Sequence, residues 1–402
     1  MIKKLDLVLL LALMGCLLAL ADVVKSEPKA DGQFEFVRPK KNEASSNGTQ
    51  QANLLERADE PVRLNLEEST ASIIYPLLEA QLLAFSDHPE KVDRRGLLFR
   101  GGLIPFKPVR FQYYHQGGRV DNDLWLRLEL KNLGTKKAVV QLIEGRGGPD
   151  SDYFQAGHVN NLQFLSRVAH GESRNLMLEP GESLTLFCQN MPYDEVLSGS
   201  AQFTLYEGSN VGFSLLSLQD PEESPSFNLL TKASDVHARG IYACTDQFVN
   251  RIFNLPEDKD VQVAIGAVRQ PNVYQEPELK GDYGVIYAMR FLVNNNSEED
   301  KTVHVIANPR GGKATVTALL QTEVLEESPP PFTWLNAQVP ALESFRNGGA
   351  WQDCSLHRES EAFQENVIGQ FCAPAQKSTL VRLLTIPEGA SNYPVRFILR
   401  AK

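Results

Sequence analysis

One stretch of this chain occurs twice, and each copy has the pattern of two β-strands joined by a polar turn. The first copy, RLELKNLGTKKAVVQLIEGRGG, runs from Arg127 to Gly148, and the second, RFLVNNNSEEDKTVHVIANPRGG, runs from Arg290 to Gly312. Leu, Val and Ile favour a half-buried strand surface, and the Asn-rich break between the two runs favours a turn. The duplication therefore predicts two related β units within one chain.

Short strand-like runs separated by turn signals surround both copies, and such spacing is typical of a β-sandwich or barrel. A chain of 402 residues is too long for one core and suits about two domains. We therefore expect an all-β protein of two tandem antiparallel β-sandwiches, Ig-like or Greek-key in type and related by internal duplication. The expected boundaries are residues 77–220 for the first domain, 221–226 for a linker, and 227–402 for the second domain.

Three further segments complete the expected organisation. One short helix is predicted at about residues 153–169, because Val159, Leu162, Leu165 and Val168 recur at helical spacing. The second domain is expected to carry an insertion at about 326–376. Residues 22–63 are rich in Lys, Glu, Asn, Ser and Gln, and such a composition predicts a disordered tether.

The first 21 residues are typical of a secretory signal peptide. Lys3 and Lys4 precede a nearly pure aliphatic run at 7–18, and Ala19-Leu20-Ala21 provides the small-x-small pattern of a cleavage site. The run is shorter than the roughly 20 residues of a spanning helix. In one alternative, Leu13-Met14-Gly15-Cys16 acts as a lipobox and Cys16 is lipidated; in another, the segment stays as an uncleaved anchor. Each alternative predicts export to the cell envelope or the extracellular space, with membrane contact expected only through a lipid anchor.

Export to an oxidising compartment would allow cysteines to pair. Four cysteines lie beyond the signal segment, and they permit three connectivities. A bridge between Cys354 and Cys372 is the favoured one, because these residues lie close in sequence within one domain, and closing that loop would stabilise the fold by roughly 3 kcal/mol. Cys188 and Cys244 occur in strand-like runs and are expected to be buried free thiols.

Charge and motifs exclude several classes of function. A net charge of −10 argues against nucleic-acid binding, which needs a concentrated basic face. The sequence has no G-x-S-x-G elbow, phosphate loop, dinucleotide fingerprint or H-E-x-x-H motif. His158 follows Asp150 and Asp152, but helix capping accounts for both acids. We therefore expect no cofactor, no metal and no catalytic residue.

Four residues are candidates for ligand binding, and each also has a structural interpretation. Arg146 and Arg310 occupy the same place in the two copies. They could contact an anion or an acidic sugar, or they could fix a loop whose two glycines make a tight turn. Trp334 and Trp351 lie in the insertion, where they could stack on sugar rings or pack onto the sheet as a flap. The structural interpretation is favoured for both pairs.

Three segments resemble motifs of exported bacterial proteins that have paired β domains. They are GDYGV at Gly281–Val285, PRGG at Pro309–Gly312 and PEGASNYPV at Pro387–Val395. The likeness covers most of residues 77–402 apart from the insertion. That family has no assigned activity, so the resemblance implies architecture and export without a chemistry. Some of its members carry a module named after copper amine oxidases, but this chain shows no such module and no His-rich copper pattern.

These observations predict an exported, non-catalytic structural or binding protein whose partner is a cell-surface polysaccharide or an envelope protein. One alternative is a polysaccharide-binding module that uses the insertion around Trp334 and Trp351. The other is a carbohydrate-active enzyme whose acidic residues lie in a cleft between the two domains.

Overall fold

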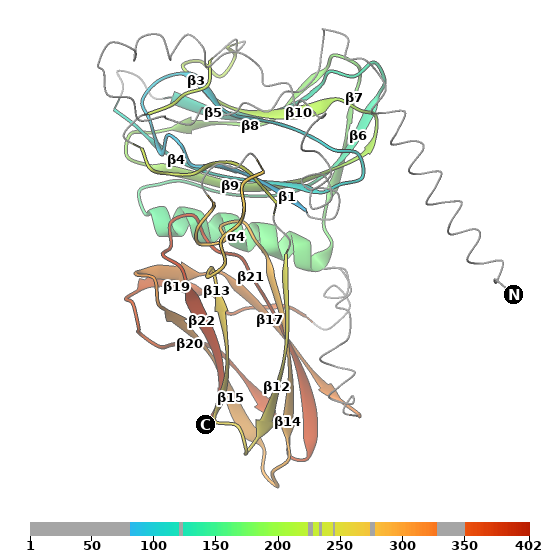
Figure 1. Ribbon diagram of the computed structural model, residues 1–402, viewed down its shortest axis with the longest axis vertical. Helices are drawn as coiled ribbons and strands as arrows, with labels where there is room; N and C mark the ends of the chain where they lie inside the picture. The colour runs from blue at the N-terminus through green and yellow to red at the C-terminus, as the bar shows by residue number, and fades with distance from the viewer. Residues whose placement is uncertain are drawn as a thin grey trace, which may run out of the picture. The chain divides into compact units, whose positions relative to one another are not determined.

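The computed structural model describes residues 81–119, 124–223, 228–232, 235–243, 246–273, 278–327 and 350–402. Over these residues the chain forms two β-sandwiches and one helix, α4 (Tyr153–His170). Figure 1 shows α4 lying between the two sandwiches. The predicted all-β class and the tandem arrangement are confirmed.

The first sandwich consists of two sheets. One sheet has the strand order β11-β1-β4-β9-β6-β7, with β2 also paired to β4, and the other has the order β3-β10-β5-β8. The strands are β1 (Leu82–Ser86), β2 (Lys91–Val92), β3 (Gly96–Gly102), β4 (Val109–Gly117), β5 (Leu124–Asn132), β6 (Ala138–Asp150), β7 (Arg174–Leu178), β8 (Ser183–Met191), β9 (Val196–Glu207), β10 (Val211–Leu218) and β11 (Arg239–Ala243). Phe99, Phe111, Phe203 and Phe213 pack together between the sheets, with ring centroids 4.9 to 5.8 Å apart.

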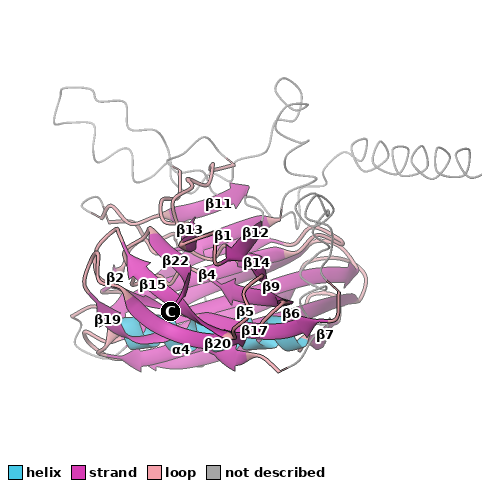
Figure 2. Ribbon diagram, turned by 90° about the horizontal axis from the view of Figure 1, so that it is seen from below, coloured by secondary structure: helices cyan, strands magenta, loops and turns pink. Residues whose placement is uncertain are grey.

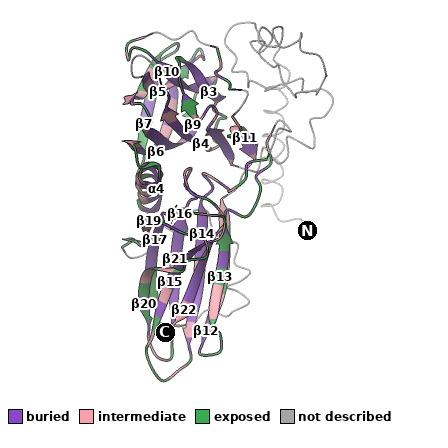
Figure 3. Ribbon diagram, turned by 90° about the vertical axis from the view of Figure 1, so that its left-hand side faces the viewer, coloured by how far each residue is buried: buried purple, intermediate pink, exposed green. Residues whose placement is uncertain are grey.

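The second sandwich also has two main sheets, of order β12-β14-β21-β17-β18 and β13-β22-β15-β20, and a small β16-β19 pair. Its strands are β12 (Gln247–Leu255), β13 (Asp260–Ile265), β14 (Tyr287–Asn295), β15 (Lys301–Pro309), β16 (Ala314–Val316), β17 (Ala318–Leu325), β18 (Gln352–Asp353), β19 (Leu356–Ser360), β20 (Asn366–Ala373), β21 (Lys377–Thr385) and β22 (Val395–Ala401). Phe253, Phe291 and Phe397 are fully buried in its core. Buried residues follow the strands of both sandwiches (Figure 3).

The two sandwiches share one strand topology. In chain order, β1, β3, β4, β5, β6, β7, β8, β9 and β10 correspond to β12, β13, β14, β15, β17, β18, β20, β21 and β22. The correspondence includes the parallel pairing of the first and third strands, β1 with β4 and β12 with β14. A cis-proline follows the first strand of each sandwich, at Pro89 and at Pro256. The predicted internal duplication is therefore visible in the order and direction of the strands.

The repeated sequence stretch, however, marks different strands in the two sandwiches. It covers β5 and β6 in the first and β14 and β15 in the second, and in each case the two strands belong to opposite sheets. In neither copy do the two strands joined by the polar turn pair with each other as a hairpin. What the copies share is a corner where the chain crosses between sheets. The Asn132 amide donates to the Lys136 and Leu178 carbonyls (2.9 and 3.0 Å), and the Asn295 amide donates to the Glu299 and Ala373 carbonyls (both 2.8 Å).

The segment after the predicted linker contributes to the first sandwich. β11 pairs antiparallel with β1, with Phe85 opposite Gly240, so it extends the first sandwich's larger sheet. The first strand of the second sandwich is β12, which begins at Gln247. The boundary predicted at residue 227 therefore precedes a strand that completes the first domain's sheet.

Helix α4 forms where the sequence predicts it. The Asp152 carboxylate accepts hydrogen bonds from the backbone amides of Phe154 and Gln155 (3.1 and 3.2 Å), and Gly171 ends the helix in the left-handed conformation at φ 69°. One face of the helix packs on residues of both sandwiches, in a cluster that includes Ile143, Phe164, Leu165, Ile286 and Leu384. Figure 2 shows α4 from below, against the strands. The helix is thus a shared layer between the two domains.

Candidate functional site

A cavity of about 1040 Å³ opens where segments of both sandwiches meet. Its wall comes from the β1–β2 turn, the end of β4, the start of α4, the segment before β11, residues 278–283, and the loop 389–392 that precedes β22. Tyrosines, carboxylates and histidines are prominent in that wall. A concave site with a few fixed polar groups is the usual form of a small-molecule or oligomer binding site.

Asp235 ties two of these segments together. Its carboxylate accepts hydrogen bonds from the backbone amides of Glu90 and His237 (2.7 and 2.9 Å) and from Nδ1 of His237 (2.6 Å). Burial opposes ionisation of Asp235, but these hydrogen bonds outweigh it and hold the pKa of the carboxyl below its usual value. The His237 ring is therefore oriented with Nε2 away from Asp235, 3.5 Å from Oε2 of Glu90.

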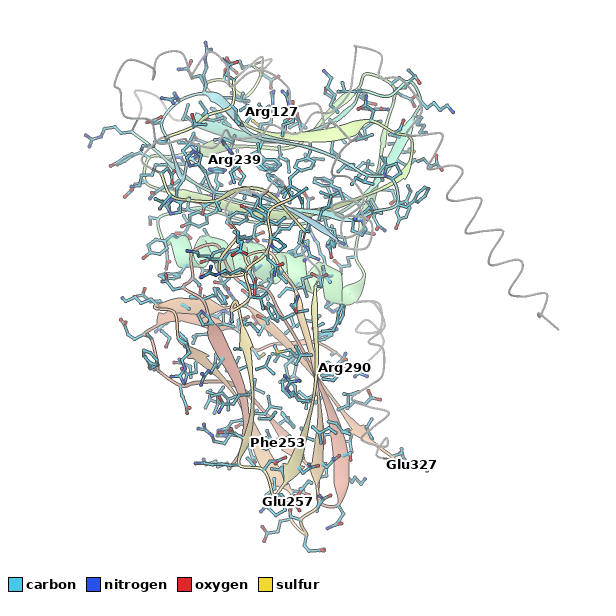
Figure 4. All side chains as sticks on the ribbon, viewed as in Figure 1. Arg127, Arg239, Phe253, Glu257, Arg290 and Glu327 are labelled. Carbon is cyan, nitrogen blue, oxygen red and sulfur yellow. The ribbon has the colours of Figure 1, made fainter. Side chains whose placement is uncertain are left out.

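His88 and Arg239 hold the same wall from behind. Nε2 of His88 accepts a hydrogen bond from the backbone amide of Lys232 (3.2 Å), so a neutral ring carries its proton on Nδ1, 3.7 Å from Asp235. Burial, together with the nearby Arg239 charge, lowers the pKa of His88. Nη1 of Arg239 donates to the carbonyls of His88, Leu98 and Leu230 (3.0, 3.3 and 2.5 Å). Nη1 of Arg239, a residue labelled in Figure 4, thus fixes the loop, and the side chain also lines the cavity.

Asp87 is the least satisfied polar group of the wall. Its side chain is 8% exposed, and Oδ1 has no hydrogen-bond partner among the described residues. Burial raises the pKa of Asp87 well above its usual value, and the charges of Glu90 and Asp235 add to that effect. Burial and these two charges therefore favour the protonated form of the Asp87 carboxyl.

Two tyrosines, Tyr114 and Tyr283, line the cavity together with Asp87. Burial raises the pKa of Tyr114, and the carboxylates of Glu90 and Asp87 raise it further. The Tyr283 hydroxyl donates to the Ser391 carbonyl (3.0 Å), and its ring stacks on Phe85 with a centroid distance of 6.0 Å. Burial, with a contribution from Asp87, raises the pKa of Tyr283 to about 12. Both side chains therefore stay neutral and contribute aromatic surface to the cavity wall.

A second polar cluster, the Glu388 cluster, lies beside the cavity loop and consists of Glu388, Thr315, Thr317, His158 and His357. Glu388 is fully buried and accepts hydrogen bonds from the hydroxyls of Thr315 and Thr317. Nδ1 of His158 lies 2.9 Å from the Thr317 hydroxyl oxygen and 3.5 Å from Oε1 of Glu388. Nε2 of His158 lies 2.8 Å from Nδ1 of His357.

The proton arrangement in the Glu388 cluster follows from the number of donors. The Thr317 hydroxyl has one hydrogen and gives it to Glu388, so Nδ1 of His158 must donate to the Thr317 oxygen. One proton then lies between the facing nitrogens of His158 and His357. Because His158 belongs to α4 and the other members to the second sandwich, the Glu388 cluster joins the two domains beside the cavity loop.

The four predicted ligand-binding residues do not meet at the cavity. The Arg146 guanidinium lies 5.4 Å above the Phe187 ring, and that of Arg310 lies 5.0 Å above the Phe363 ring. Trp351 is half-buried and packs against the helix cluster, and Trp334 lies outside the described residues. Within the part of the chain that the structure describes, none of these side chains lines the cavity.

The glycines that follow the two arginines permit close backbone contacts. A Cβ added at Gly147 would lie 1.9 Å from the carbonyl oxygen of Ala156 in α4, and one added at Gly311 would lie 2.1 Å from the carbonyl oxygen of Tyr393. Side chains cannot fit at either position. The repeated Gly-Gly sequence thus allows α4 and the loop before β22 to approach the strand ends.

The predicted bridge between Cys354 and Cys372 is not formed, and both thiols are free. Cys354 is 5% exposed within the second core, whereas Cys372 is exposed on β20. Phe371 and Ala373 face inward, and alternation along the strand turns Cys372 to the opposite face. Cys188 is free and half-buried rather than buried. Cys16, Cys244, the signal segment and the tether lie outside the described residues.

Two segments that line the cavity resemble each other in sequence, and this likeness alone predicts a different arrangement. Ser86-Asp87 and Ser234-Asp235 each precede an Arg-Gly pair and an apolar strand, at Arg95-Gly96 and Arg239-Gly240. This likeness suggests the openings of two domains. The structure instead pairs β1 with β11 in one sheet and places Asp87 and Asp235 at one cavity.

Comparisons with known proteins assign no family. No protein-family model matches the chain, and no curated protein sequence matches it. Among solved structures, the N-terminal CBM22-1-CBM22-2 tandem domain from Paenibacillus barcinonensis Xyn10C aligns with 8% identity and a TM-score of 0.18, covering 72% of this chain and 82% of that one. The CUB1-EGF-CUB2 domains of rat MASP-1 align with 6% identity and a TM-score of 0.15, covering 77% of this chain and 99% of that one.

TM-scores of this size support no inference about function. In the part of the chain that the structure describes, no helix has the length and apolar character needed to cross a bilayer. The site's own geometry is therefore the basis for assigning a role.

Proposed function

We propose that this protein is an exported, non-catalytic binding protein of the cell envelope or the extracellular space, and that a segment of polysaccharide binds in the cavity between its sandwiches. The observation that carries the proposal is the cavity itself. Its volume of about 1040 Å³ is slightly above the roughly 300–1,000 Å³ that ligand sites occupy. Residues from both sandwiches line it, so a ligand there would contact both domains.

The chemistry of the wall suits a sugar. Tyr114, Tyr153, Tyr242 and Tyr283 line the cavity, and aromatic rings provide apolar faces for the C–H surface of a sugar ring. Donors and acceptors held in place by the Asp235 hydrogen bonds stand beside those rings. Polyhydroxylated ligands need both kinds of surface at once. This combination favours a saccharide over a purely apolar ligand.

The export half of the proposal rests on the signal-like residues 1–21. N-terminal sequencing of protein recovered from culture medium and from envelope fractions tests it. A mature start at Asp22 would support cleavage by signal peptidase, and a lipid-modified Cys16 would support the lipobox alternative. Protein found only in the cytoplasm with its first 21 residues intact would refute export.

Binding is tested by applying residues 22–402 to a glycan array and measuring each hit by calorimetry. Tyr153, in the first turn of α4, lines the cavity and is 45% exposed, so Tyr153→Ala is expected to weaken binding at least tenfold. Tyr206 on β9 is 44% exposed and does not line the cavity, so Tyr206→Ala is a matched control. No glycan binding, or equal losses in the two variants, would refute the proposal.

A carbohydrate-active enzyme is the second candidate, and the Asp235–His237 pair favours it. Asp235 orients His237 by a 2.6 Å hydrogen bond and leaves Nε2 directed toward Glu90. A carboxylate that orients an imidazole is a common general-base arrangement. Shortened products after incubation with a bound glycan, detected by mass spectrometry and absent with His237→Gln, would establish this candidate and exclude the non-catalytic role.

A further inference from the structure

Asp87 is set apart from the other acids of the cavity by its unused hydrogen-bonding capacity. Asp235 accepts three hydrogen bonds, Glu90 lies 3.5 Å from His237, and Glu278 lies 3.5 Å from Arg269. The Asp87 carboxyl is more than nine-tenths buried, lines the cavity, and has an oxygen without a partner among the described residues. Buried polar groups normally have a partner, so this oxygen is available to a ligand.

The unpartnered oxygen of Asp87 selects the kind of ligand group. Glu90 and Asp235 raise the pKa of Asp87 by their charges, but Arg239, Lys91 and Lys280 line the same cavity, so the wall as a whole carries both signs of charge. Arg239 and Lys91 have other contacts: Arg239 donates to three carbonyls, and Lys91 lies 3.5 Å from Asp194. A carboxylate oxygen forms its strongest hydrogen bond with a charged donor, so a cationic group is the best partner for Asp87.

Aromatic residues of the same wall suit a cation as well. Tyr114 and Tyr283 line the cavity together with Asp87. Tyr114 is almost fully buried, and Tyr283 is stacked on Phe85, so both rings are held in place. An ammonium group is attracted to the face of an aromatic ring.

We infer that the cavity binds a saccharide that carries a protonated amino group, and that Asp87 is the counter-ion of this ammonium. This inference rests on the proposed function, because it specifies the ligand of the same cavity. An amino sugar combines the hydroxyl-rich ring that the tyrosine-lined wall accommodates with the positive charge that Asp87 lacks. A uronate or phosphate-bearing saccharide would bring a second negative charge to the same place.

The binding reaction includes one proton. In the free protein, burial and the charges of Glu90 and Asp235 raise the pKa of Asp87 and favour its protonated form. The approach of an ammonium favours the carboxylate form, so the Asp87 proton passes to the buffer as the ligand binds. Release of a proton makes the affinity rise with pH, by up to about tenfold for each pH unit. The other titratable and charged groups of this part of the wall are Glu90, Asp235, His88, His237, Lys91, Lys280, Arg239, Tyr114 and Tyr283.

The test compares a tetramer of glucosamine with a tetramer of N-acetylglucosamine, which keeps the sugar backbone and lacks the charge. Calorimetry in phosphate and in Tris buffer at pH 6 gives both the dissociation constant and the number of protons released. We expect the glucosamine tetramer to bind at least tenfold more tightly than its acetylated counterpart. We also expect release of about one proton, as the linkage above requires.

Two variants separate Asp87 from the other groups. Asp87→Asn replaces the carboxyl by an uncharged amide of the same shape, so the thermal midpoint is expected to change little. The variant should lose at least tenfold in affinity for the glucosamine tetramer, and its proton release should disappear. Asp93, exposed and outside the cavity wall, provides the matched control Asp93→Asn, which should behave as wild type.

Each outcome decides between the two proposals. Equal affinity for the two tetramers, or unchanged proton release in Asp87→Asn, would refute the amino-sugar inference and leave saccharide binding standing. If neither tetramer binds while Tyr153→Ala abolishes binding of another glycan, the inference fails and the proposed function survives. If no glycan binds at all, both fail.

Discussion

Glu388→Gln tests whether the Glu388 cluster stabilises the second sandwich and its contact with α4. Glu388 has no exposed surface and receives hydroxyl hydrogens from Thr315 and Thr317, with His158 3.5 Å away. Glutamine fills the same space but keeps a single acceptor oxygen. Its amide nitrogen would face a hydroxyl that can no longer donate to it. The substitution therefore changes hydrogen bonding while leaving the packing intact.

The expected cost follows from those contacts. One hydrogen bond to a charged acceptor is lost, worth about 1.5–3 kcal/mol. The Thr315 hydroxyl can turn to Oγ of Ser391, 3.0 Å away, so it keeps an acceptor and adds no further cost. For a domain of this size, each kcal/mol lowers the midpoint by about 2–4 °C, so we expect a fall of about 3–12 °C.

Scanning calorimetry measures the midpoint, and urea denaturation measures the free energy of unfolding. Glu223→Gln is the matched control, because Glu223 pairs with Arg95 at 2.7 Å on the surface. Exposed pairs contribute about 1 kcal/mol or less. If Glu388→Gln destabilises the protein no more than Glu223→Gln does, the reasoning about the Glu388 cluster is refuted.

Three further measurements check other parts of the structure. His115 is fully buried, and burial lowers its pKa from 6.5 to about 4. Because the unfolded chain takes up the proton first, the stability of the protein should fall as the pH drops from 6.5 to about 4. Urea denaturation should show that His115→Gln reduces this loss of stability by about 2–3 kcal/mol. In native protein, iodoacetamide should label Cys372 and spare Cys354, because burial raises the pKa of the Cys354 thiol to about 12. Peptide mapping that shows equal labelling of the two cysteines would contradict the burial of Cys354. Asn132→Ala and Asn295→Ala should each cost about 2 kcal/mol, since each leaves two corner carbonyls without their donor; a loss confined to one of them would show that the two corners differ.

The sequence predicted the elements that depend on local pattern. The position of α4 follows from apolar residues at helical spacing and from the capping carboxylate of Asp152, and both are local. The β-rich class and the tandem arrangement follow from strand-like runs and the duplication. Burial of Cys354 but not of Cys372 depends on which face of each segment meets the core, so sequence proximity alone was misleading.

Local sequence patterns do not predict which strands pair with one another. A strand, a turn and a second strand look alike whether the chain returns within one sheet or crosses to the opposite one, so both copies of the repeat suggested hairpins. The cavity was missed for a related reason. Asp87 and Asp235 are far apart in sequence, and only the pairing of β1 with β11 brings them to one wall. Glu388 meets His158 only because α4 contacts the second sandwich.

The position of β11 also bears on how this protein can be divided. β11 covers the outer edge of β1, and an uncovered edge strand offers free amide and carbonyl groups to any extended chain. A first domain truncated before β11 would therefore tend to self-associate, and it would also lose Ile241 from its core. Soluble halves would have to be cut between β11 and β12, around residues 244–246, which keeps the closing strand with the sheet it protects.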